Sequence, residues 1–348
     1  MKRYFSVEIL RFLTSVSVLL YHYRHFFYPF NILSDDDYEI EKLELPFYNF
    51  IDWLYSYGFY GVHVFYTISG FVFAHVYLVS KEKTSFKEFS INRVARLYPL
   101  HFATLLFVAL SQLLYLTNYG DFQFKLINDF FHFFLQLFFI SSWGFENGHS
   151  FNAPIWSVSV EVGIYILFFC LIRVLKKYQL KLLILISVIL ILIDKLKIFD
   201  TLFLECARLF FSGSLVYFLI NYNTKKMIYM ILSLCLLVFS FIGNFKTFVF
   251  CPTLLLLFLS FENFINQESV KNSFGFLGNL TYALYLLHVP YQLSIIYLFE
   301  ILSIETNLFN NVIFFFAYFL SLCVIASIVF SFYEKPLNKI IRKRLLNV

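Results

Sequence analysis

Residues 6–28 read SVEILRFLTSVSVLLYHYRHFFY. A helix needs about 20 mostly apolar residues to cross the hydrocarbon core of a bilayer, and this stretch is long enough. Nine further stretches have the same character, and they lie at roughly 54–79, 98–117, 154–173, 181–198, 202–220, 227–243, 247–262, 276–299 and 311–333. We therefore expect one all-α transmembrane domain over residues 1–348, with about ten membrane-spanning helices.

The composition supports this class of protein. Of the 348 residues, 60% are hydrophobic and 14% are charged, whereas soluble domains are about half apolar and a quarter charged. A disordered or fibrous protein is excluded, and the basic residues form no stripe that would bind nucleic acid. The five cysteines are scattered without the spacing of metal ligands or of a disulfide framework, so we predict no metal site.

The distribution of charge predicts how the chain is oriented. If the N-terminus is cytoplasmic, most of the 27 lysines and arginines fall in short cytoplasmic segments. Both termini are then cytoplasmic, and the number of spans is even. The acidic residues between Asp35 and Glu44 form a solvated outer loop, and the basic tail after Pro336 lies on anionic lipid headgroups.

The first apolar stretch carries two ionisable side chains that share one helix face. Arg11 and His22 are eleven residues apart, which is three turns plus 20°, or about 16 Å along the helix axis. Thr14, Ser15 and Ser17 make the surface between them polar. Two residues that snorkel to water are the alternative, but a shared face favours a functional stripe that points into the bundle. An arginine can bind a phosphate or carboxylate, and a histidine can accept a proton from a hydroxyl.

Arginines and a carboxyl group mark two other predicted helix ends. Arg93 and Arg96 are three residues apart at the membrane surface, and their spacing suits either a phosphorylated cofactor or simple positive-inside anchoring. Ser157 and Glu161 share a helix face, and Glu161 lies too deep for a casual surface charge. It needs a partner, for which His22 or an arginine would serve, and a structural ion pair is the alternative.

Two further spans combine small or polar residues on one face. Gly61, Ser69 and Gly70 permit close approach of helices, for which packing is at least as good an explanation as ligand binding. Tyr285 and His288 follow Thr281 on one face of the ninth predicted span, just before Pro290, which is expected to kink that helix.

Taken in order, six of these motifs resemble the acyltransferase 3 family of integral membrane acyltransferases. They are Arg11 with His22; the stretch from Gly61 to Phe71; Arg93, Arg96, Tyr98 and Pro99; Trp156, Ser157 and Glu161; Thr281, Tyr282, Tyr285 and His288; and Glu334 with Pro336. The chain departs from the family pattern at His63, where aspartate is usual, and at Thr281, where serine is usual.

The resemblance implies a membrane O-acyltransferase. Such proteins move an acyl group, usually acetyl from acetyl-CoA, to a hydroxyl of a glycan such as O-antigen or capsule. Some relatives carry a fused SGNH-type esterase domain after the last span, and we expect none here because Val348 follows soon after Pro336.

The expected site combines these residues. Arg93, Arg96 and Arg11 hold the donor, His22 acts as base or as nucleophile, Glu161 orients a histidine, and Ser157, Tyr285 and His288 line the groove. Two alternatives remain. The first is a transporter or flippase of a sugar or lipid-linked substrate, because internal Arg, His and Glu also suit a proton-coupled carrier. The second is an acyltransferase-like protein without catalysis.

Overall fold

The computed structural model describes residues 3–27, 45–80, 84–124, 126–198, 201–222, 226–242, 247–262 and 268–346. Within these ranges the secondary structure consists of helices, and no β-strand occurs. The acidic residues predicted for an outer loop fall outside the described residues. The helices of the first half are α1 (Phe5–Tyr23), α3 (Tyr48–Tyr57), α4 (Gly61–Phe73), α5 (Phe86–Tyr119) and α6 (Phe130–Leu137), with short turns η1 (Arg24–Phe26), η2 (Gly58–Tyr60) and η3 (Ala74–Leu78).

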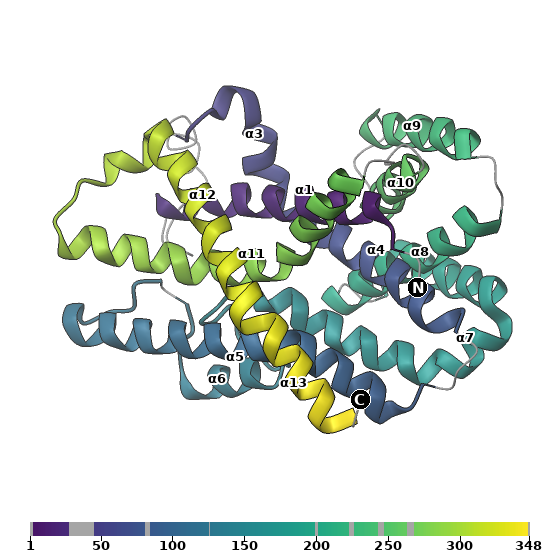
Figure 1. Ribbon diagram of the computed structural model, residues 1–348, viewed down its shortest axis with the longest axis horizontal. Helices are drawn as coiled ribbons and strands as arrows, with labels where there is room; N and C mark the ends of the chain where they lie inside the picture. Colours follow the sequence, from purple (N-terminus) through teal and green to yellow (C-terminus); the bar gives the residue numbers. More distant parts are fainter. Residues whose placement is uncertain are drawn as a thin grey trace. The chain divides into compact units, whose positions relative to one another are not determined.

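The second half of the chain continues the helical pattern (Figure 1). Its helices are α7 (Ile155–Lys195), α8 (Leu202–Tyr222), α9 (Lys226–Ile242), α10 (Thr247–Ser260), α11 (Glu268–Ile301), α12 (Val312–Val329) and α13 (Lys335–Leu346), with short turns η5 (Thr306–Asn310) and η6 (Phe330–Glu334). The all-helical prediction is confirmed for the described residues.

Each of the ten predicted stretches falls on a helix, but the count of ten spans is not confirmed. Among the described residues, seven helical runs are long and apolar enough to cross a membrane. Helix α7 is assigned as one run over two predicted spans, with non-helical backbone angles at Gln179. Helices α9 and α10 have only 17 and 14 residues. The cytoplasmic location of both termini stays a prediction.

The chain divides into two compact units. The first unit comprises Met1–Thr14, Phe59–Ser85 and Val160–Asn279, and the second comprises Ser15–Gly58, Phe86–Ser159 and Leu280–Val348. Helices α1, α7 and α11 therefore each contribute residues to both units.

In the first unit, α4 and α8 are in backbone contact (Figure 1). A Cβ atom added to Gly70 would lie 1.7 Å from the carbonyl oxygen of Phe210, and one added to Gly213 would lie 1.8 Å from that of Thr67. The hydroxyl of Ser214 donates a hydrogen bond of 2.9 Å to the carbonyl of Gly70. The glycine pattern of the second predicted span thus serves helix packing at Gly70.

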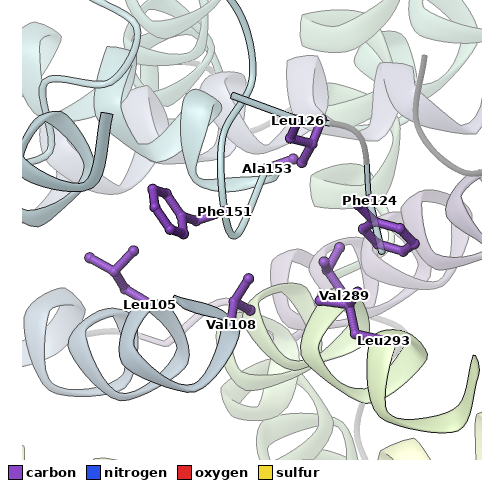
Figure 2. Packing of buried hydrophobic residues seen from close by; sticks show 8 residues of the cluster. All are labelled: Leu105, Val108, Phe124, Leu126, Phe151, Ala153, Val289 and Leu293. Carbon is purple, nitrogen blue, oxygen red and sulfur yellow. The ribbon is translucent and has the colours of Figure 1, made fainter. Parts of the chain in front are cut away.

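In the second unit, an apolar cluster joins four parts of the chain. Figure 2 shows side chains of α5, of the segments on either side of α6, and of α11 converging on one core; its members are Leu105, Val108, Phe124, Leu126, Phe151, Ala153, Val289 and Leu293. Helix α6 is capped at its N-terminus by Asp129, whose carboxylate accepts the amide of His132 at 2.8 Å. Helix α13 packs along α5.

Candidate active site

The polar face of α1 is buried, as predicted. Ser15 and Val18, which lie between Arg11 and His22 on that face, are 1% and 0% exposed, whereas Leu13 on another face is 50% exposed. Because α1 is helical from Phe5 to Tyr23, the two ionisable residues do share one face.

The second unit brings His22 next to His288. The centroids of the two imidazole rings are 4.9 Å apart, and the ring planes are inclined by 45°. His288 is fully buried on α11, and the ring of His25 lies 5.2 Å from that of His22. One turn beyond His288, the side-chain amide of Gln292 donates a hydrogen bond of 3.2 Å to the carbonyl of His22. The carbonyls in the last turn of a helix lack intrahelical partners, so this bond both satisfies α1 and ties it to α11.

Several basic groups act on His22. The groups that act on it electrostatically include His288, His25, Arg24 and His149. The guanidinium of Arg24 stacks on the ring of Tyr21 at 3.8 Å and also donates to its hydroxyl. A guanidinium near a reacting imidazole can stabilise an anionic intermediate.

His149 lies outside the membrane-spanning helices, and burial lowers its pKa, while the charge of Glu146 acts in the opposite direction. The sequence analysis overlooked Arg24, His25, His149 and Gln292. Only the run His22-Tyr23-Arg24-His25, which continues the polar end of the first stretch, signals part of this set.

Ser157 and Tyr285 are hydrogen-bonded to each other, and their place in a substrate groove stays a prediction. Their hydroxyl oxygens are 2.8 Å apart, and the hydroxyl of Tyr285 donates to the carbonyl of Pro154 at 2.9 Å. The hydroxyl of Ser157 also lies 3.2 Å from that carbonyl. These bonds fasten the start of α7 to α11, one turn before His288.

Arg93 and Arg96 lie one turn apart on α5 in the second unit, and both are half-buried. The backbone of α5 just beyond them is held by two tyrosines: Tyr282 donates to the carbonyl of Leu97 at 2.6 Å, and Tyr333 donates to that of Pro99 at 3.2 Å. The arginines therefore sit on a fixed segment of α5. Their role toward a donor stays a prediction.

Arg11 and Glu161 belong to the first unit. A guanidinium nitrogen of Arg11 lies 3.4 Å from the carboxylate of Glu8, which also pairs with Arg3 at 3.3 Å. Glu161 acts electrostatically on Cys206 of α8. The structure thus groups His22, Arg93, Arg96, Ser157, Tyr285 and His288 in the second unit and leaves Arg11 and Glu161 in the other.

His63, at the position where an aspartate was expected, has a carboxylate beside it. Its Nε2 lies 3.4 Å from Oε1 of Glu205, which α8 contributes, and both residues belong to the first unit. Thr281 is buried in the second unit. Among the described residues, no three His, Cys, Asp or Glu side chains are placed to hold a metal ion.

Two adjacent imidazoles, of which that of His288 is fully buried, form a candidate proton-transfer site. The several apolar helices of membrane length define a multi-pass membrane protein. The chain belongs to the acyltransferase 3 family, because the family's acyltransferase domain matches residues 4–331. It is accordingly a membrane acyltransferase. No curated protein and no solved structure matches the chain.

Proposed function

We propose that this protein transfers an acetyl group from acetyl-CoA to a hydroxyl of a cell-surface glycan, such as O-antigen or capsule, at the cell inner membrane. The observation that carries the proposal is the pair of imidazoles, His22 and His288, in a chain of an acyltransferase family. Acyl transfer from a thioester to an alcohol needs a group that removes the hydroxyl proton and a group that protonates the leaving thiolate.

The two histidines can provide both functions in an addition followed by an elimination. One imidazole takes the proton of the acceptor hydroxyl as its oxygen attacks the thioester carbonyl. The carbon–sulfur bond then breaks, and an imidazolium returns a proton to the sulfur, so that free CoA and an O-acetyl ester result. The cation of Arg24 stabilises the oxyanion formed between these events. His22 as a nucleophile, which would carry the acetyl group itself, is the second form of the same reaction.

The donor is held by arginines. Arg93 and Arg96 bind its phosphate groups from the cytoplasmic side, because guanidinium groups recognise phosphate bidentately. Arg11 and Glu161 belong to the first unit, and their roles toward the donor and toward a histidine stay predictions. Tyr285 and Ser157 contribute by fixing the turn of α11 that carries His288.

The test is transfer of radiolabelled acetyl from acetyl-CoA to a surface-glycan extract by the protein purified in detergent. His22→Ala and His288→Ala should lower transfer by about 10²–10⁴-fold, the usual contribution of general acid–base catalysis. His75→Ala is the matched control, since His75 lies in the first unit, where it contacts Tyr217 and Tyr4. Full transfer by a folded His22→Ala protein would refute the assigned role. Glycan movement without CoA release would favour the carrier.

A second measurement separates base from nucleophile. Labelled acetyl-CoA is added without acceptor, and the denatured protein is examined for bound label. A nucleophilic His22 gives label that disappears in His22→Ala but persists in His75→Ala, whereas a general base gives none.

A further inference from the structure

Helix α11 contains a proline in its interior, and one backbone hydrogen bond of the helix is therefore missing. Pro290 has no N–H group, so the carbonyl of Leu286, four residues earlier, loses its helical partner. Leu286 is fully buried, and a buried carbonyl without a donor is costly. The affected turn carries His288.

Asn152 supplies the missing donor. Its side-chain nitrogen lies 3.2 Å from the carbonyl oxygen of Leu286 and 3.1 Å from the hydroxyl oxygen of Thr104 on α5. The hydroxyl of Thr104 donates its own proton to the carbonyl of His101 at 3.0 Å, so it accepts from Asn152. Both partners are therefore acceptors, which fixes the orientation of the amide.

The segment that carries Asn152 is itself held firmly. Asn152 is fully buried, and its neighbours Phe151 and Ala153 belong to the apolar cluster that also contains Val289 of α11 (Figure 2). Phe151 has a left-handed backbone with φ of 39°, and its amide donates to the side chain of Asn128 at 2.7 Å. Asn152 is thus presented to α11 from a fixed support in the same unit.

We propose that Asn152 is a positioning residue, which replaces the N–H group that Pro290 lacks and so holds the turn of α11 that places His288 beside His22. The inference rests on the proposed function for its effect on catalysis. Loss of the amide lets the turn between Leu286 and Pro290 shift, while Tyr285 remains attached to Pro154. A shift of about 1 Å at a catalytic group can cost on the order of 10²-fold in rate.

A double-mutant cycle tests the proposal. Asn152→Ala should lower kcat by at least about tenfold with little change in KM for acetyl-CoA, because chemistry is impaired and donor binding is not. Pro290→Ala restores an N–H group to the Leu286 carbonyl. In that background Asn152→Ala should cost no more than about two- to threefold. Ser327→Ala, which removes a hydrogen bond to the carbonyl of Cys323 within α12, is the matched control and should keep wild-type kcat.

Thermal unfolding of the same four proteins provides a readout that needs no substrate. We expect Asn152→Ala to lower the midpoint and Pro290→Ala to remove most of that loss. An equal effect of Asn152→Ala in both backgrounds, or no effect in either, overturns the proposal. If Asn152→Ala does not fold and Pro290→Ala does not restore folding, the proposal also fails. If the wild-type protein transfers no acyl group, the proposed function fails, while the unfolding cycle still decides the role of Asn152.

Discussion

Replacing Gly70 by alanine should weaken the contact between α4 and α8. The new methyl carbon would lie 1.7 Å from the carbonyl oxygen of Phe210 and 2.5 Å from its carbonyl carbon. Nonbonded heavy atoms pack best at roughly 3.5 Å or more, so the two helices must separate locally by on the order of 1 Å. The obstacle is backbone, which cannot rotate away as the end of a side chain can.

The size of the effect follows from three contributions. Overpacking of a close contact costs about 1–3 kcal/mol. Separation also breaks the bond from the hydroxyl of Ser214 to the carbonyl of Gly70, which is worth about 1 kcal/mol. Alanine regains about 1 kcal/mol because it is a better helix former than glycine. The expected net loss is about 2 kcal/mol, which changes the folding equilibrium by roughly 30-fold.

The assay is reversible unfolding of the purified protein in mixed micelles, followed by helical circular dichroism. Ser69→Ala is the matched control, since it alters the neighbouring residue of the same helix without adding a Cβ atom. The free energy of unfolding should fall for Gly70→Ala and stay near the wild-type value for Ser69→Ala. Equal stability of the two variants would refute backbone contact at Gly70.

Three further predictions concern other parts of the molecule. Glu262→Ala should lower the free energy of unfolding by roughly 1–3 kcal/mol in the same assay, because this carboxylate accepts the first amides of α1 at 3.0 and 2.8 Å. The melting temperature of the wild-type protein should be higher in phosphatidylglycerol than in phosphatidylcholine, and replacing Lys339 and Arg342 of α13 by glutamine should reduce this difference. Both residues are exposed, and each basic residue near an anionic lipid surface contributes about 1 kcal/mol of binding free energy. The hydrogen bond from the His132 amide lowers the pKa of Asp129. The wild-type protein should therefore be more stable than Asp129→Asn above the unfolded-state pKa of about 3.9, and this advantage should disappear as pH falls through the lower folded-state pKa. A pH series of melting temperatures for the two proteins measures it.

Features that depend on neighbours in sequence could be predicted. The apolar stretches became helices because their length and composition are local properties. The buried face of α1 followed from the helical period, since Ser15 and Val18 lie between Arg11 and His22 on it. The close packing at Gly70 followed from the absence of a side chain.

Features that depend on distant partners could not be predicted. His22 and His288 were both named, but the spacing on each helix says nothing about which rings meet. Ser157 and Tyr285 were named separately, and nothing in the sequence indicates that their hydroxyls are hydrogen-bonded to each other. The number of spans also stays a prediction, because the described parts of α9 and α10 have 17 and 14 residues.

The spacing between Arg11 and His22 sets the angle between their side chains around the axis of α1. An unbroken helix fixes the angle between two of its side chains, so the polar face keeps its direction along the whole element. Both ends of α1 are also held by side chains from distant segments: the carboxylate of Glu262 accepts the amides of its first turn, and the amide of Gln292 donates to the carbonyl of His22 in its last. These bonds satisfy the groups that a helix leaves unpaired at its termini, and they oppose rotation of α1 about its axis. Each anchor lies in the same unit as the end of α1 that it holds, so it fixes the direction of that end within its unit.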